Sequence, residues 1–323
     1  MTIQRRYLAL MCTLLCAAPM TWAQTYPDRP VRIVVPYTPG GSTDLIARII
    51  SEPLSRALGK PVIVENKSGA GGMLGTQELV RAAPDGYTLG IGTVSTMVIF
   101  PAVHPKPGYA IEQIWPITNI ATMPNVLAVR PNFPAKDLKE LVALLKANPG
   151  KYSFATSGQG SINHMLAESF QSGAGVVINH IPYRGSGPAL QDVMAGQVDI
   201  VFDQLPSSKN FIDAGKLGLL GVISSGRLTD YPQAMTMEEI GIKDLKDPAW
   251  YGLIAPAKLS TEVQTKLIKA MKEVMAMPDV KARLSKIGAV PFGNTSIEFL
   301  AQINQEIARM KVLVRERKIS LDE

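Results

Sequence analysis

Cysteine is nearly missing from this sequence. The 323 residues include two cysteines, Cys12 and Cys16, and both lie within the first 23 residues. If that segment is removed, the remaining chain has no disulfide, no thiolate nucleophile and no cysteine ligand for a metal. A lipid anchor is not expected, because the residues that precede the two cysteines, Met11 and Leu15, are not small.

Long hydrophobic runs are missing as well. The apolar stretch at residues 7–18 is too short to cross a bilayer comfortably, and no later stretch has 18 uncharged apolar residues. Arg5 and Arg6 precede the stretch, and small residues at Thr21 and Ala23 follow it. We therefore predict a signal peptide over residues 1–23, cleaved before Gln24, and a periplasmic protein without a membrane anchor.

The motifs of several enzyme classes are missing too. The three histidines, His104, His164 and His180, include no pair spaced as metal ligands on one helix or loop. The G-x-S-x-G motif of hydrolases and the G-x-x-x-x-G-K-[ST] nucleotide loop do not occur. We therefore expect no enzyme, no metal and no cofactor, and keep an enzyme acting on a small organic acid only as a distant alternative.

Concentrated positive charge is the last absence. The net charge is +6, or +4 without residues 1–23, and the basic residues are scattered without a basic run interleaved with aromatics. The densest basic patch, residues 311–318, alternates with apolar residues, which is typical of a solvated helix face. Nucleic acid is therefore not an expected partner.

What the sequence does contain is a strand, loop and helix order that occurs twice. The predicted strands are 31–35, 61–64, 88–92, 126–129, 152–156, 177–181, 198–202, 217–223 and 251–255, and the predicted helices are 45–58, 71–82, 138–145, 163–170, 188–195, 261–275 and 296–315. Pro53 predicts a kink or break in the first helix near Glu52. Strands separated by helices predict mainly parallel sheets flanked by helices.

The second occurrence predicts two α/β lobes. We expect lobe 1 to comprise residues 24–123 and 252–323, because the last two helices have few strands of their own to cover, and lobe 2 to comprise residues 124–251. The chain would then cross between the lobes near 121–126 and 250–256. Two crossings between two lobes are typical of a hinged clamp that binds its ligand in the cleft between them.

Two glycine-rich loops point to the kind of ligand. Residues 36–44 and 156–163 each follow a strand and open a helix, and Gly41 and Gly160 stand at equivalent places in them. The free N–H groups of a helix's first turn and its dipole favour an anion there. Taken alone, the first loop is equally well explained as a tight turn with Ser42 as N-cap; the second loop favours a binding site.

These loops resemble those of a known family. The segments VVPYTPGGSTD (34–44), ENKSGAGG (65–72), PDGYTL (84–89), ATSGQGS (155–161) and HIPYRG (180–185), with His164 and Asp199, resemble the tripartite tricarboxylate transporter substrate-binding family, the Bug receptors. The resemblance covers nearly the whole chain after residue 23. It implies a periplasmic receptor with the fold of type II-like binding proteins, whose two α/β lobes close on a small carboxylate held by loop backbone groups and ordered waters. Pro53, Met97, Val98 and Arg184 depart from the family's pattern.

From the loops and the resemblance we predict a set of ligand-binding residues. In lobe 1 these are Tyr37, Thr38, Pro39, Gly40, Gly41, Ser42, Thr43, Asp44, Gly71, Gly72, Met73, Thr93, Ser95 and Thr96, and in lobe 2 Thr156, Ser157, Gly158, Gly160, Ser161, His164, Tyr183, Arg184, Gly185 and Asp203.

Four of these have a competing interpretation. Asp44 is a first-turn cap or a ligand contact, and His164 is structural or a ligand contact. Asp203 caps the turn after its strand or meets an amine or hydroxyl of the ligand, and Arg184 meets a second carboxylate or faces solvent near the hinge.

The predicted function is a solute receptor. We expect it to capture a di- or tricarboxylate, an acidic amino acid or an aromatic acid for a tripartite tricarboxylate-type transporter, and to be a monomer. The alternative is a partner that presents its ligand to a membrane histidine kinase, which would use the same residues.

Overall fold

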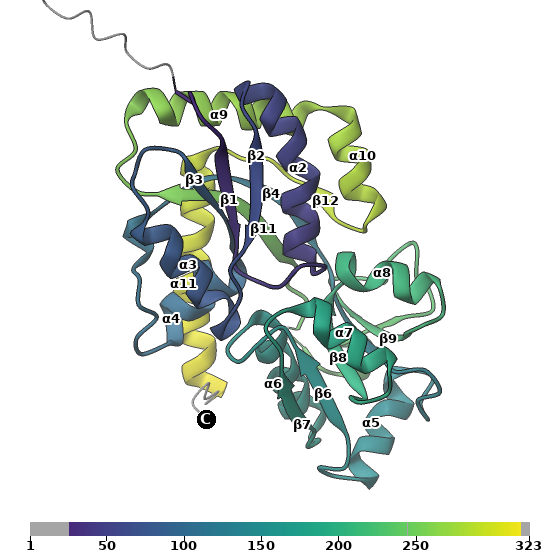
Figure 1. Cartoon of the computed structure of the whole chain (residues 1–323). Coiled ribbons are helices and arrows are strands. Elements are labelled where there is room, and N and C mark those ends of the chain that lie inside the picture. The colour runs from purple at the N-terminus through teal and green to yellow at the C-terminus, as the bar shows by residue number, and fades with distance from the viewer. Residues whose placement is uncertain (1–25, 244, 318–323) are drawn as a thin grey trace, which may run out of the picture.

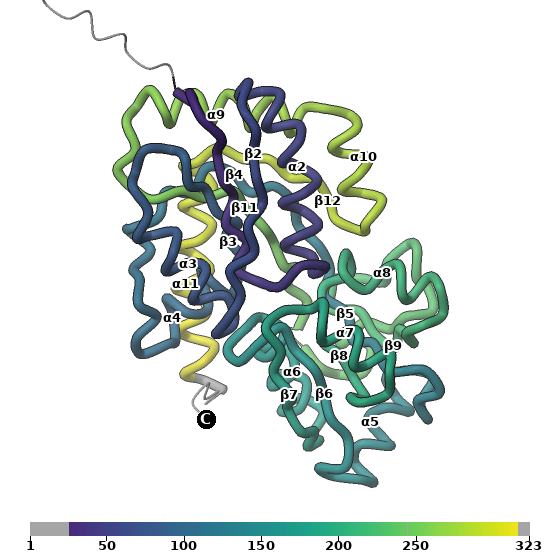
Figure 2. Tube along the Cα trace, viewed as in Figure 1, coloured from purple at the N-terminus to yellow at the C-terminus, as the bar shows by residue number. Residues whose placement is uncertain are grey.

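The computed structural model describes residues 26–243 and 245–317. The predicted signal peptide therefore lies outside the described residues. The chain forms two α/β lobes, each built on a six-stranded sheet (Figures 1 and 2). None of the helices within the described ranges is long and apolar enough to cross a membrane.

The sheet of lobe 1 has the order β12-β4-β11-β3-β1-β2. Its strands are β1 (Val31–Val35), β2 (Val62–Asn66), β3 (Thr88–Thr93), β4 (Ile114–Met123), β11 (Ala249–Pro256) and β12 (Val290–Pro291). Strands β1 to β4 share one direction, and β11 and β12 run opposite to them. The β11 strand belongs entirely to this sheet, so the predicted boundary at 251/252 falls inside it.

The sheet of lobe 2 has the order β10-β9-β5-β8-β6-β7. Its strands are β5 (Asn125–Val129), β6 (Ser153–Thr156), β7 (Asn179–Pro182), β8 (Ile200–Gln204), β9 (Gly218–Ile223) and β10 (Met235–Thr236). Five strands share one direction, and β5, which enters directly from lobe 1, runs against its neighbours β8 and β9. The predicted two-lobed α/β fold is thus confirmed. Both sheets are mixed, and their antiparallel strands include β5 and β11, the first strand that the chain enters after each crossing.

Helices cover both faces of each sheet. They are α2 (Ser42–Leu58), α3 (Met73–Arg81), α4 (Phe100–Val103), α5 (Leu138–Ala147), α6 (Ile162–Ala174), α7 (Ser186–Met194), α8 (Leu205–Asp213), α9 (Thr261–Ala276), α10 (Pro278–Lys286) and α11 (Ser296–Arg317), with short helical turns η1 (Ala70–Gly72), η2 (Ser95–Ile99), η3 (Ile111–Gln113) and η4 (Glu238–Ile240). In lobe 1, α2, α9 and α10 share one buried apolar cluster, and α3, η2 and α11 share another. In lobe 2, α5 and α6 pack on one face and α7 on the other. The C-terminal helices return to lobe 1, as predicted (Figure 1).

The first helix differs from its prediction. The α2 helix continues through Pro53 to Leu58, so the predicted alternative of a break near Glu52 is wrong, and the alternative of a kink stays a prediction. Pro53 is buried on the core face with Ile50 and Leu54, and this packing stabilises the helix despite the backbone hydrogen bond that proline removes.

Candidate functional site

A cavity lies between the two lobes. It is lined by Tyr37, Gly41, Ser42, Thr43, Thr93, Val94, Ser95, Ser157, Ile162, Asn163, Ser186, Gln204, Ala249, Trp250 and Tyr251. Among these described residues none carries a charged side chain, so any ion bound here would be held by neutral donors.

Four helices begin at this cavity. The first residues of α2 and α7, Ser42 and Ser186, line it, and so does the first turn of α6 at Ile162 and Asn163. The α8 helix starts directly after Gln204, which lines the cavity too. Because each helix N-terminus carries unsatisfied N–H groups and about half a positive charge, their convergence favours an anion without any Lys or Arg.

Asn163 presents a free donor to the cavity. Its side chain is fully buried, and its Oδ1 accepts a hydrogen bond from Ser157 Oγ at 2.6 Å. Its Nδ2 has no hydrogen-bond partner within the described part of the chain. Since an unpaired buried donor is costly, Asn163 Nδ2 is placed to meet an acceptor on a bound molecule.

The lobes are closed around the cavity. The hydrogen bonds that join them include those from Thr38 N to Arg184 O (3.3 Å), from Ile162 N to Ser95 Oγ (3.0 Å) and from Tyr251 OH to Gln204 Oε1 (3.1 Å). At Gly158 (φ +140°) an added Cβ would lie 2.9 Å from Gly71 Cα of lobe 1, so the glycine loops allow the two backbones to approach closely.

Asp44 holds the first loop in shape. Its Oδ2 accepts hydrogen bonds from Gly40 N (3.1 Å) and Arg48 Nε (3.0 Å), and its Oδ1 accepts one from Asn66 Nδ2 (3.0 Å). Burial raises the pKa of the Asp44 carboxyl, but these hydrogen bonds outweigh it and hold that pKa below its ordinary value. The carboxylate therefore stays ionised and faces its own loop, and Asp44 does not line the cavity.

Asp203 lies behind the cavity wall. The carboxylate is 1% exposed and accepts hydrogen bonds from the hydroxyls of Ser186 (2.6 Å), Ser207 (2.6 Å) and Ser208 (2.7 Å). Burial raises its pKa, and the three hydroxyls partly oppose that shift. The carboxylate of Asp203 therefore accepts its hydrogen bonds from serine hydroxyls in the first turns of α7 and α8.

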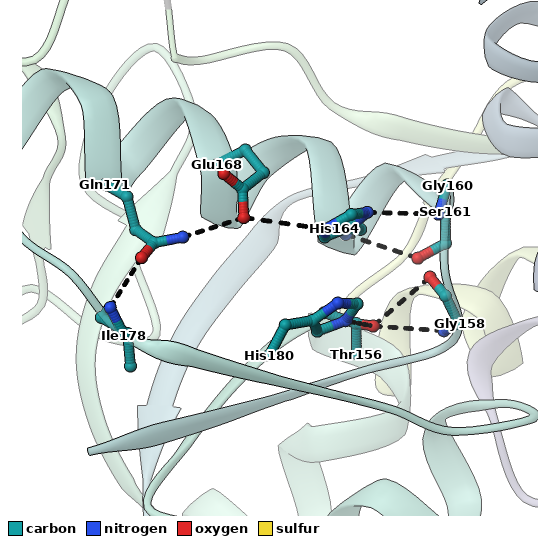
Figure 3. A network of polar contacts seen from close by, with 9 residues as sticks. All are labelled: Thr156, Gly158, Gly160, Ser161, His164, Glu168, Gln171, Ile178 and His180. Carbon is teal, nitrogen blue, oxygen red and sulfur yellow. Dashed lines mark hydrogen bonds and ion pairs between the residues drawn. The ribbon is translucent and has the colours of Figure 1, made fainter. Parts of the chain in front are cut away.

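His164 and His180 support the second loop, although sequence spacing did not predict their contact. Their rings stack with centroids 4.1 Å apart, and Phe154 stacks on the other face of His180 (4.8 Å). Figure 3 shows that His164 Nδ1 accepts from Gly160 N (3.2 Å) and that His180 Nε2 contacts Thr156 Oγ1 (2.7 Å). Glu168 lies 3.6 Å from His164 Nε2. No cluster of three or more potential metal ligands occurs among the residues with described positions.

The stack makes the stability of the protein depend on pH. Burial, with a smaller contribution from the charge of His164, lowers the pKa of His180 from 6.5 to about 4. Between these values the unfolded chain binds a proton that the folded chain does not, so the contribution of His180 is complete above pH 6.5 and is lost as the pH falls toward 4. We expect this loss to reach at most about 3 kcal/mol.

Urea unfolding of the wild type and of His180→Gln at pH 7, 5.5 and 4 measures the effect. The free energy of unfolding should fall more steeply with decreasing pH in the wild type, because glutamine does not titrate. Equal pH dependence in the two proteins would contradict the assignment to His180.

Seven of the predicted site residues line the cavity. They are Tyr37, Gly41, Ser42, Thr43, Thr93, Ser95 and Ser157. The other predicted residues of the two loops, of η1 and of the starts of α3 and η2 do not line the cavity: Thr38, Pro39, Gly40, Gly71, Gly72, Met73, Thr96, Thr156, Gly158, Gly160 and Ser161. Tyr183, Gly185 and Arg184 are outside it too. The Arg184 side chain is exposed, and its backbone oxygen accepts the interlobe hydrogen bond from Thr38.

Two departures from the family pattern are apolar core residues. Met97 and Val98 lie in η2, are at most 1% exposed and belong to the buried cluster that includes Trp250. Neither lines the cavity.

Eight lining residues were not predicted. They are Val94, Ile162, Asn163, Ser186, Gln204, Ala249, Trp250 and Tyr251. Asn163 follows the predicted residue Ser161 by two positions, and Ser186 directly follows the predicted residue Gly185. Extending the predicted site into the first turn of each helix would have included both residues. Trp250 and Tyr251 lie on β11, which the second crossing brings to the cavity. A hydrogen bond from Trp250 Nε1 to Glu306 Oε2 (2.8 Å) fixes the indole in the wall.

Comparison with known proteins finds relatives over nearly the whole chain. Residues 46–319 match the model of the tripartite tricarboxylate transporter family receptor. BugT of Bordetella pertussis is 36% identical over 302 residues, which are 93% of this chain and 92% of BugT. Two structures from Rhodopseudomonas palustris are similar: Rpa4515 with adipate (30% identity, TM-score 0.87, covering 91% of this chain and 99% of that one) and MatC with bound malate (31%, 0.85, 90% and 100%).

Proposed function

The chain belongs to the tripartite tricarboxylate transporter receptor family, and we propose that its cleft captures a small carboxylate and delivers it to the membrane subunits of such a transporter. The family consists of periplasmic solute-binding receptors and not of enzymes. Di- and tricarboxylates, acidic amino acids and aromatic acids are the candidate ligands, and the relatives with adipate and malate make dicarboxylates the first to test.

The observation that carries the proposal is the chemistry of the cavity wall. Four helix N-termini and the unpartnered Nδ2 of Asn163 supply donors. Val94, Ile162 and Trp250 supply an apolar wall for a short carbon skeleton. Hydrogen bonds to a charged group contribute about 1.5–3 kcal/mol each, so a few such donors outweigh the absence of a cationic side chain.

Calorimetry with paired probes tests the proposal. We expect at least one acid among malate, adipate, glutamate and benzoate to bind, and its carboxamide to bind at least ~10-fold more weakly, because the amide lacks the charge that the helix termini favour. Equal affinity for an acid and its amide would contradict the proposal. Deletion of the gene should then abolish uptake of that acid; retained uptake with a lost transcriptional response would favour the sensory alternative.

A further inference from the structure

Two serines meet across the cleft. Ser42 begins α2 in lobe 1, and Ser207 lies in the first turn of α8 in lobe 2. Ser207 N donates to Ser42 Oγ (3.0 Å), and the two hydroxyl oxygens lie 2.8 Å apart. Both residues are buried, at 2% and 5% exposure, so this contact is shielded from water.

The direction of the hydroxyl pair follows from Asp203. Ser207 Oγ has a single proton and donates it within lobe 2, to Asp203 Oδ2 at 2.6 Å or to Gln204 O at 2.9 Å. The proton between the two serines must therefore come from Ser42 Oγ. Ser42 consequently has no proton left for a carboxylate, although its side chain lines the cavity.

Ser42 also completes a helix that lacks its own cap. Gln204, the N-cap residue of α8, makes no side-chain cap hydrogen bond in the described structure; its side chain instead contacts Asn125 and Tyr251. A first-turn N–H needs an acceptor from outside the helix. Ser42 Oγ provides it for Ser207 N from the opposite lobe, which is possible only when the cleft is closed.

We propose that Ser207, held by Asp203, is a positioning residue that latches the closed cleft through Ser42. This inference rests on the proposed function, because the latch acts by holding a captured carboxylate. It assigns Ser42 to lobe closure and leaves the contact with the carboxylate to backbone N–H groups and Asn163. Loss of the latch should speed release of the carboxylate and leave its capture nearly unchanged.

Stopped-flow or surface binding with malate and adipate as probes measures the latch. Ser42→Ala and Ser207→Ala should each raise the dissociation rate about 5- to 30-fold, the range expected for an N-cap interaction, with the association rate changed less than ~2-fold. The double variant should be no worse than the more affected single variant, because both changes remove one interaction. Additive effects, or unchanged dissociation rates, would overturn the proposal.

Ser208→Ala is the matched control. Ser208 also donates to Asp203 (2.7 Å), but its described hydrogen bonds all lie within lobe 2. If the serines acted only by stabilising the Asp203 site, Ser208→Ala would raise the dissociation rate as much as Ser207→Ala. We expect its rate to stay within ~2-fold of the wild type.

Disulfide trapping tests the contact without any carboxylate. In a chain with Cys12→Ala and Cys16→Ala, the pair Ser42→Cys and Ser207→Cys should form an intramolecular disulfide on mild oxidation, since the two oxygens are only 2.8 Å apart. If no disulfide forms either with or without malate and adipate, the latch is overturned. Trapping in a protein that binds none of the acids would refute the proposed function and leave the contact itself standing.

Discussion

Replacing Asn163 with aspartate is expected to weaken carboxylate binding by at least ~100-fold and to leave the fold intact. The substitution keeps the shape of the side chain but replaces the unpartnered Nδ2 donor with a second oxygen that carries charge. A lost hydrogen bond to a charged group costs about 1.5–3 kcal/mol, and repulsion between two carboxylates adds to it. Aspartate is favourable in the first turn of a helix, so α6 should form normally.

Two variants isolate the effect. Asn163→Ala removes the donor without adding charge and should lose about 10- to 150-fold. Asn304→Asp makes the same change of net charge on the exposed face of α11 and should bind like the wild type. Calorimetry with malate and adipate gives the affinities and circular dichroism checks the fold. An Asn163→Asp protein that binds as tightly as the wild type would remove Asn163 from the site.

Gly187→Ala is expected to hold the clamp open. Gly187 lies in the first turn of α7, where its backbone accepts alanine without left-handed strain, but an added Cβ would lie 2.5 Å from the backbone oxygen of Pro39 in lobe 1. This clash exists only when the lobes are closed, so the open form keeps its stability. Overpacking of this size costs about 1–3 kcal/mol, and affinity should fall roughly 5- to 150-fold.

Small-angle scattering shows whether closure is the affected step. The wild type should become more compact when saturated with a bound acid, and Gly187→Ala should stay expanded under the same conditions. Gly226→Ala, in lobe 2 with no atom within 4 Å of the added Cβ, is the matched control and should close normally. Normal compaction and affinity in Gly187→Ala would mean that the closed arrangement described here is not the one that binds.

The sequence predicted the parts of the site that depend on local signals. A β-branched strand followed by glycines and a helix start placed Gly41 and Ser42 in a loop at the carboxyl end of β1, and the same pattern placed Ser157 in lobe 2. Such signals need only neighbouring residues, because the conformational freedom of glycine and the helix N-terminus are local properties. The two-lobed fold followed from the repetition of this pattern.

The parts that were missed depend on distant segments. The α8 helix was not predicted, and the role of its Ser207 depends on Ser42, which is 165 residues away in the chain. The ten-residue strand β4 was missed because Pro116 lies inside it; its partner β11 shifts register between Leu253 and Ile254, beside that proline. The stacking of His164 on His180 joins two different elements, and no spacing rule covers it.

Native mass spectrometry of the protein purified under non-denaturing conditions from the periplasm of its own host identifies what the cleft binds. We expect one small carboxylic acid bound per chain and released on denaturation, without a metal or a nucleotide. Reproducible recovery of a neutral or cationic solute, in place of an acid, would contradict a cleft built from helix N-termini and the free amide of Asn163.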